Sequence, residues 1–297
     1  GCQISYYDDS MEEPDTMMAS SNNYLIPLVL GYFKDRWVFG KEAKRLAVVG
    51  EDCTETDLYG KAKRREKVSL AGKTYDAVWL LAKYISLTLQ DFENIQYLTF
   101  TTPETDVDMA KMLKGIGQHI GVDKEIINVQ DYKESFCQYM IFQPKELWQY
   151  ESALFYCDED RIKAYMLRRL RVDASHGMNS FVTVDEVANA QRKELEALYP
   201  IMNKEKSPDE SFKSMIENVF EKKVISSVYL TGEGFEKNWY PNSLRVLCNG
   251  RRAFMGNNLY SKGACYKSIR KCEPNDDGPI YLDETKLTER ICLRMRV

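Results

Sequence analysis

The chain has 297 residues, of which 44% are hydrophobic and 29% are charged, and this length is enough to bury the core of one large or two medium domains. A formal net charge of -4 at pH 7 gives no electrostatic basis for binding nucleic acid or an anionic membrane surface. No apolar stretch approaches the roughly 18 to 20 residues that a membrane helix needs, and no secretory signal is visible, so we expect a soluble protein.

The first 92 residues are predicted to form short strands and turns, followed by one long helix. We expect strands at residues 2–7, 24–30 and 36–39, turns at 8–14 and 31–35, and a helix that begins within 41–46. Residues 51–67 are rich in charge and show no apolar face, so they are predicted to be a loop or a frayed helix. In residues 76–92 apolar side chains recur every three or four positions, which predicts an amphipathic helix.

The next fifty residues alternate between strand and helix patterns. Strands are expected at residues 95–102 and 125–129, and each precedes a predicted helix, at 104–120 and 131–142. The first of these helices has a face of apolar side chains: Met109, Met112, Leu113, Ile116 and Ile120. Such a β-α-β-α succession implies parallel strands joined by crossover helices.

A predicted hairpin opens the second half of the chain. Its strands, residues 152–156 and 162–167, flank an acidic turn that contains Asp158, Glu159 and Asp160. Helices are expected next at residues 183–198 and 208–222, because each segment starts with carboxylates, which favour the positive end of a helix. We attribute these carboxylates to helix capping rather than to catalysis.

Residues 224–270 combine two strands, a glycine turn and two helices. Residues 224–230 are rich in β-branched and aromatic side chains, which predicts a buried strand, and the turn Gly232-Glu233-Gly234 follows. A helix that starts near Pro241 and a short strand at 252–255 come next. The chain then passes Asn257 into a second helix with a patch of small residues: Ser261, Gly263 and Ala264. Further strands are predicted in the tail, at 279–283 and 290–297.

This order of elements resembles the adenosine-binding segment of the superfamily that contains actin, sugar kinases and the seventy-kilodalton heat-shock chaperones. There the glycine turn lets the backbone approach the nucleoside, so the resemblance makes Gly232, Glu233, Gly234 and Asn257 the candidate nucleotide-binding residues. The succession at residues 95–142 is also similar to the order in the chaperone family. The resemblance implies a two-lobed, actin-like α/β architecture of the ribonuclease-H-like type, in which each lobe is a mixed sheet with flanking helices.

The resemblance also implies a division of the chain. Lobe one is expected at residues 1–150, and lobe two, with the adenosine-type segment, at 151–272. Residues 273–297 are expected to be a β-rich C-terminal extension that is incomplete, because the sequence stops in the middle of a predicted strand.

In this superfamily the nucleotide phosphates lie between two hairpins. By chain order the first hairpin begins before Cys2, and the second falls on residues 156–163. The family has glycines in the second hairpin, since backbone N–H groups must approach the phosphate oxygens without a Cβ in the way. Carboxylates stand there instead and would repel a triphosphate. Asp158 and Asp160 are candidate magnesium ligands, and a solvent-facing acidic turn is the simpler interpretation.

Asp131 is the candidate catalytic residue if the chain is an ATPase. The connecting helix of the family starts with an acidic residue and a proline and continues into small residues, which allow close helix contact. Asp131 can stand for the acidic residue, but Tyr132, Lys133 and Glu134 replace the proline and the small residues. This departure argues against hinge closure of the usual kind.

Other chemistries find less support in the sequence. The eight cysteines form no CxxC pair and the chain has two histidines, so no zinc site is expected. Such cysteines are typical of buried thiols in a reducing compartment, and we therefore expect a cytoplasmic protein. No dinucleotide fingerprint, phosphate loop or nucleophile elbow is found.

Three functions are compatible with these patterns. We favour a noncatalytic scaffold or regulated interaction module, which has an unidentified protein partner and binds adenine nucleotide weakly. The alternative is a working ATPase of the chaperone type, with magnesium, whose first phosphate motif precedes Cys2. A sugar-kinase-like phosphotransferase ranks last because no sugar-binding aspartate motif is visible. Neither nucleic acid nor membrane is expected as a partner.

Overall fold

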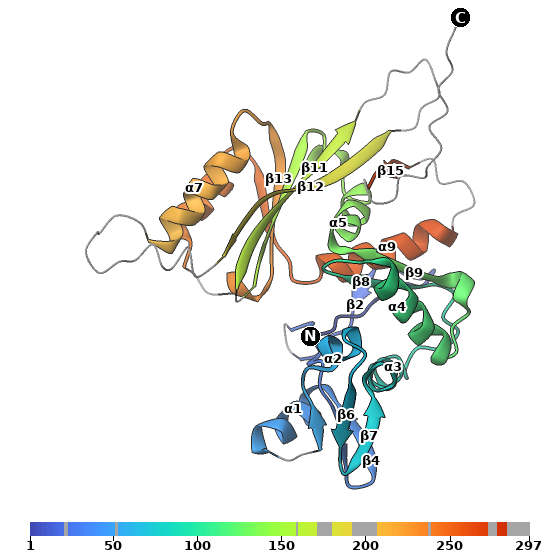
Figure 1. The fold of residues 1–297 in the computed structure, drawn as a ribbon. Helices are drawn as coiled ribbons and strands as arrows, with labels where there is room; N and C mark the ends of the chain where they lie inside the picture. Colours follow the sequence, from blue (N-terminus) through green and yellow to red (C-terminus); the bar gives the residue numbers. More distant parts are fainter. Residues whose placement is uncertain are drawn as a thin grey trace, which may run out of the picture. The chain divides into compact units, whose positions relative to one another are not determined.

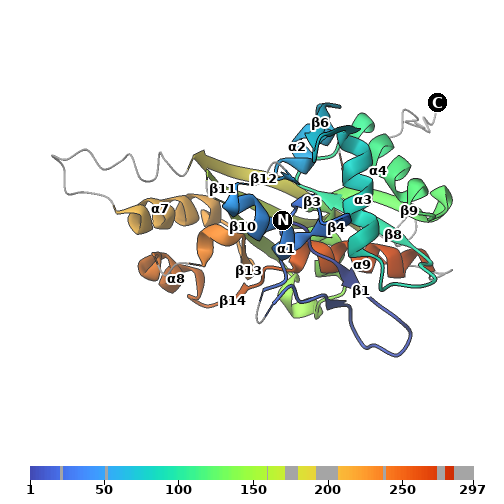
Figure 2. The same ribbon diagram turned by 90° about the horizontal axis from the view of Figure 1, so that it is seen from below.

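The chain forms two compact units, seen in a computed structural model that describes residues 1–20, 23–50, 53–158, 160–170, 180–191, 207–236, 239–272 and 278–283 (Figures 1 and 2). Unit 1 comprises Gly1–Ser135 and Asn258–Pro274, and unit 2 comprises Phe136–Asn257 and Asn275–Val297. The chain therefore leaves unit 1 within helix α5 (Tyr132–Ile141) and returns to it just before helix α9 (Leu259–Cys272). These bounds differ from the expected lobes, chiefly because α9 belongs to unit 1.

Unit 1 begins with short antiparallel strands and three helices. The strand pairs are β1 (Ser5–Tyr6) with β2 (Asp15–Thr16), β3 (Leu30–Phe33) with β4 (Arg36–Phe39) and β5 (Thr54–Glu55), and β6 (Lys67–Leu70) with β7 (Lys73–Asp76). The helices are α1 (Gly40–Val49), α2 (Leu58–Lys63) and α3 (Ala77–Thr88). Helix α3 starts where the sequence predicts, because Asp76 Oδ1 accepts the backbone N–H groups of Val78 and Trp79 at 2.8 and 3.3 Å.

Three predictions for this region are wrong. The strand expected at residues 24–30 is reduced to an isolated bridge at Ile26, and β3 occupies much of the expected turn at 31–35. Residues 53–67, expected to lack an apolar face, contain β5 and α2, and α2 buries Leu58 and Ala62 completely. Two apolar side chains one turn apart are enough to anchor a short helix when a core is available.

The second part of unit 1 confirms the predicted β-α-β-α succession. Strand β8 (Leu98–Thr102) is parallel to β9 (Ile127–Asp131), and α4 (Val107–His119) and a 3₁₀ helix (Lys124–Ile126) lie between them in the chain. Helix α4 buries the predicted methionine-rich face: Met109, Met112, Leu113 and Ile116. Helix α9 also reaches β8, since Ser268 Oγ lies 2.7 Å from Thr99 Oγ1.

Unit 2 contains a six-stranded mixed sheet, which Figure 1 shows beside α7. The strand order is β14 (Arg252–Met255), β13 (Ile225–Thr231), β10 (Glu151–Cys157), β11 (Arg161–Leu170), β12 (Phe181–Gln191), β15 (Ile280–Tyr281). Strand β11 is antiparallel to both of its neighbours, β10 and β12. The other pairs are parallel: β13 with β10, β14 with β13, and β15 with β12. The predicted hairpin is thus confirmed, and β13 lies in the interior of the sheet.

Helices cover both faces of this sheet. Helices α7 (Pro208–Phe220) and α8 (Pro241–Leu247) contribute Phe212, Ile216 and Leu247 to a core with the inward side chains of β10, β11 and β13. On the opposite face, the rings of Phe136 and Tyr139 from α5 each lie 5.9 Å from the ring of Tyr229. Burial on both faces explains why the consecutive residues Val228, Tyr229 and Leu230 of β13 are all apolar.

The helix expected at residues 183–198 is wrong where the structure describes it, because residues 181–191 form strand β12. The pattern Thr183-Val184-Asp185-Glu186 imitates a helix start, but pairing with β11 satisfies the charges across strands. Asp185 Oδ2 accepts from Arg168 Nη1 at 2.8 Å, and Glu186 lies 3.4 Å from Lys163 Nζ. Residues 192–198 of that expected helix lie outside the described residues.

The C-terminal expectations are confirmed only in part. Within the strand expected at 279–283, residues Ile280–Tyr281 form β15, and the strand expected at 290–297 lies outside the described residues. None of the helices in the described part of the chain has the length and apolar character that crossing a membrane requires.

Candidate functional site

Most of the predicted site residues lie at one edge of the sheet in unit 2. Strands β10, β13 and β14 are parallel neighbours, and Tyr156 pairs with Thr231 while Leu230 pairs with Met255, so their carboxyl ends lie side by side. In α/β sheets this edge is where ligands usually bind. The loops there carry these predicted residues: Asp158, Asp160, Gly232, Glu233, Gly234 and Asn257.

Asp131 belongs to unit 1 and lies at the end of β9. Its Oδ1 accepts the backbone N–H of Glu134 at 2.8 Å, which is the geometry of a helix cap at the start of α5. The structure therefore accounts for an acidic residue at this position through helix capping.

The turn between β10 and β11 is closed by Asp158. The backbone N–H of Asp158 donates to the carbonyl of Arg161 at 3.1 Å, and its carboxylate Oδ1 accepts the backbone N–H groups of Asp160 and Arg161 at 2.8 and 2.7 Å. A phosphate at this hairpin would need the same N–H groups. It would have to displace a carboxylate of like charge, so the residues present do not fit a nucleotide phosphate.

The glycine turn after β13 packs against this hairpin. Gly232 has φ 101°, and a Cβ on it would overlap the carbonyl oxygen of Cys157. A Cβ on Gly234 would overlap Cys157 Sγ and lie 2.9 Å from the carbonyl oxygen of Asp158. The carbonyl of Gly234 also accepts the indole N–H of Trp239 at 2.8 Å. Close packing within the protein therefore explains both glycines.

The same edge is electrostatically unfavourable for an anion. Burial, which is the largest cause, and the charges of Asp158 and Glu233 together raise the pKa of Tyr156 to about 12. Asp160 and Asn257 are exposed. Among the residues that the structure describes, no group of three or more His, Cys, Asp or Glu side chains could hold a metal ion.

A family model described as "Family of unknown function (DUF5716) C-terminal" matches residues 13–284, which is most of the chain. The chain belongs to this family. No curated protein matches it. The description of the DUF5716 family assigns no activity.

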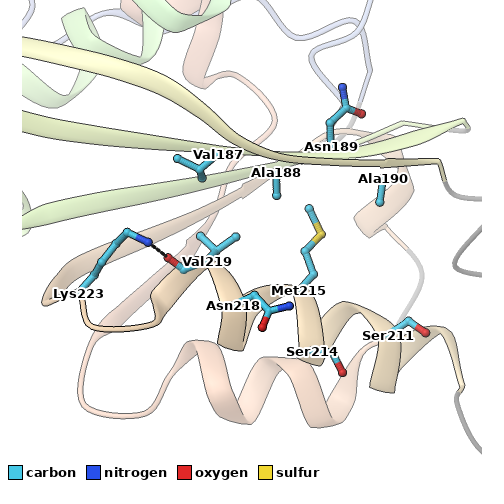
Figure 3. Close-up of a pocket in the computed structure, with 10 residues that line it drawn as sticks. All are labelled: Val187, Ala188, Asn189, Ala190, Ser211, Ser214, Met215, Asn218, Val219 and Lys223. Atoms are coloured by element: carbon cyan, nitrogen blue, oxygen red, sulfur yellow. Dashed lines mark hydrogen bonds between the residues drawn. The ribbon is translucent and has the colours of Figure 1, made fainter.

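This DUF5716 member also has a pocket that sequence reasoning missed. A groove of about 430 Å³ lies between β12 and α7 (Figure 3). It is lined by Val187, Ala188, Asn189, Ala190, Ser211, Ser214, Met215, Asn218, Val219 and Lys223. Small side chains on both walls leave the space open. The sequence did not predict this groove, because residues 183–191 were expected to be a helix. The groove forms only when strand β12 packs against α7.

Proposed function

We propose that the chain is a noncatalytic relative of the actin-like superfamily that works as a scaffold or regulated interaction module. The architecture of unit 2 supports the fold part of this proposal. An antiparallel series β10–β11–β12 is followed by β13 and β14, which are added in parallel on the other side of β10. The elements thus follow the order that the resemblance implies: the β10–β11 hairpin, the crossover helix α7, and the interior strand β13, which ends in the glycine turn.

The fold part of the proposal is also supported by a contact between α5 and α9, the helices near which the chain passes from one unit to the other. In the superfamily, small residues allow the connecting helices to approach closely. Here α5 lacks such residues at its start, but a Cβ on Gly263 of α9 would overlap the carbonyl oxygen of Ser135 of α5. The rings of Tyr132 and Tyr260 stack at 3.8 Å beside this contact. Helix α9 therefore supplies the small residue that α5 does not.

The function part rests on one observation, the turn closed by Asp158. Its carboxylate occupies the N–H groups of Asp160 and Arg161 that a phosphate would use. Loss of charge-assisted phosphate contacts, each worth about 1.5 to 3 kcal/mol, lowers ATP affinity by orders of magnitude. An adenosine base needs only backbone clearance and apolar contact, so adenosine should lose less. Adenine nucleotide binding, if retained, is therefore weak and insensitive to the phosphates.

Phosphate release and calorimetry test this proposal. We expect no steady ATP hydrolysis with magnesium, and we expect ATP to bind no better than adenosine. Magnesium-dependent preference for ATP would overturn the proposal. Steady turnover that disappears in Asp131→Ala or Asp158→Ala would establish the alternative, a working ATPase.

Gly234→Val, which the resemblance suggests as a test of base binding, is unsuitable for that purpose. The added side chain would collide with Cys157 Sγ and so perturb the fold rather than a ligand site. Amide chemical shifts of Gly232 and Asn257 during titration with adenosine are a better measure. Shifts at both residues would support base binding at this edge, and their absence would leave the pure interaction module.

A further inference from the structure

Along most of its outer edge, strand β12 faces no other strand in the part of the chain that the structure describes. On one side β12 pairs with β11 from Phe181 to Gln191, with a β-bulge at Val187, since Tyr165 pairs with Glu186 and Ala164 pairs with Ala188. On the other side, within the described residues, it pairs only through Phe181 and Val182, with β15. Backbone N–H and C=O groups on this side of residues 184–190 therefore face no described strand. Such an edge is a template for the addition of another strand.

An apolar groove lies directly beside this edge. Figure 3 shows Val187, Ala188 and Ala190 pointing from β12 toward α7, where Met215 and Val219 point back at them. Asn189 points to the opposite face of the sheet. A strand added to β12 would place every second side chain on the α7 side, because successive side chains alternate between the two faces. The groove would receive these side chains.

Polar groups mark the two ends of the groove. Near Ala190, Ser211 is only 7% exposed, and its hydroxyl has no hydrogen-bond partner among the described residues. Near Val187, Lys223 Nζ donates one hydrogen bond, to the carbonyl of Val219 at 2.6 Å (Figure 3). An ammonium group has three donors, so Lys223 retains donors for an anionic group.

We propose that this groove binds an extended peptide segment of another protein. The peptide adds as a strand to β12, places alternate apolar side chains between β12 and α7, and sets a carboxylate against Lys223. A strand edge that faces no described strand favours a peptide over a small amphiphile, because only a peptide backbone matches its repeating donors and acceptors. The inference rests on the proposed role as an interaction module and gives that role a surface, but it uses none of the nucleotide arguments.

The probe is a synthetic peptide of alternating valine and threonine with a free C-terminal carboxylate, titrated into the ¹⁵N-labelled full chain. Main-chain bonding is largely independent of sequence, so we expect weak binding with amide shifts at residues 187–190 and 214–219. Two analogues carry N-methyl groups on the odd or on the even residues. Since only one set of N–H groups of an edge strand faces its neighbour, one analogue should bind at least tenfold more weakly than the other.

Charge is tested separately. Lys223→Gln and amidation of the peptide C-terminus should each weaken binding about tenfold, and together no more than either alone, because both remove the same charge-assisted contact. Lys222→Gln is the matched control, since Lys222 is the adjacent lysine, its side chain is 89% exposed and it does not line the groove. Ser214→Trp should block binding by filling the groove, with thermal unfolding to confirm that the variant is folded.

Several results would overturn the proposal. Absence of shifts at residues 187–190 with millimolar peptide would exclude strand addition. Equal binding of both N-methylated analogues would indicate an amphiphile site. Concentration-dependent self-association that perturbs the same residues and resists the peptide would show that a second copy of the chain occupies the edge. ATP hydrolysis is measured on the same samples, so that failure of peptide binding without hydrolysis refutes the docking site and leaves the noncatalytic assignment standing.

Discussion

Asp209 holds the start of helix α8 from the first turn of helix α7, and its removal should destabilise unit 2. The side chain is buried, with 4% of the residue exposed, and its carboxylate accepts the backbone N–H groups of Asn242 and Ser243 at 2.7 and 2.8 Å and the Ser243 hydroxyl at 2.7 Å. Helix α8 begins at Pro241, and the preceding Tyr240 makes no side-chain cap. Asp209 therefore satisfies the N–H groups that the missing cap leaves without acceptors.

Asp209→Ala leaves the buried N–H group of Ser243 and the partly buried N–H group of Asn242 without an acceptor. Each unsatisfied buried group costs about 1 to 3 kcal/mol, so we expect the free energy of unfolding to fall by about 4 kcal/mol. At roughly 2 to 4 °C per kcal/mol, the melting temperature should fall by about 8 to 16 °C. Glu217→Ala is the matched control, because Glu217 is exposed on the same helix, and its effect should stay within about 0.5 kcal/mol. Equal urea midpoints for the two variants would refute this reasoning.

The same contacts determine the pH range in which Asp209 stabilises the fold. Burial would raise the pKa of its carboxyl group, but hydrogen bonds from Ser243 and Asn242 outweigh burial, and the pKa is lowered. The unfolded value is about 3.9, so the stabilisation is fully present above that pH and is lost as the pH falls through the folded pKa. The difference in unfolding free energy between wild type and Asp209→Asn should stay constant from neutral pH to about pH 5 and shrink below about pH 4. A difference in unfolding free energy that grows as the pH is lowered would contradict this prediction.

Two further predictions concern a close contact and an ionisation. Gly263→Ala should destabilise unit 1 by about 1 to 3 kcal/mol, because the added Cβ would overlap the carbonyl oxygen of Ser135. Gly115→Ala, at an open position of α4, should stabilise unit 1 by about 0.5 to 1 kcal/mol. Thermal unfolding in which both variants change stability in the same direction would refute this prediction. Burial raises the pKa of Tyr156 to about 12, so stability should fall as pH rises above the ordinary tyrosine value of about 10. Urea unfolding of Tyr156→Phe should show a smaller alkaline loss than wild type, and an unchanged loss would count against the assignment.

The elements that the sequence predicted well combine a local start signal with a face that the fold buries. Ser207 starts α7 by accepting the backbone N–H of Glu210 at 3.2 Å, and Asp76 does the same for α3. The small-residue patch on α9 is buried as expected, including Gly263 and Ala264. In these segments the chain's local preference and its tertiary environment agree, which is why periodicity sufficed.

In the elements that the sequence did not predict, local preference and tertiary environment disagree, or a local signal was overlooked. The sequence of strand β12 resembles a helix start, and pairing with β11, the preceding strand in the chain, makes it a strand instead. The β6–β7 hairpin had a usable signal, since Val68 and Leu70 alternate before Ala71-Gly72, and both turn residues have positive φ, 48° and 74°. The groove beside β12 could not be predicted while β12 itself was taken for a helix.

A glycine turn after a strand indicates that the backbone approaches something closely, but it does not say what. At Gly232 and Gly234 the neighbour is the hairpin of Cys157 and Asp158, so the turn and the hairpin hold each other in place. A ligand at this edge must compete with hydrogen bonds that the protein already makes, including those of the Asp158 carboxylate. At residues 184–190 of β12, by contrast, a peptide strand would replace water at backbone groups that face no described strand. Since displacing water costs less than displacing hydrogen bonds within the protein, we expect a ligand to bind at the β12 groove rather than at the edge that the resemblance singled out.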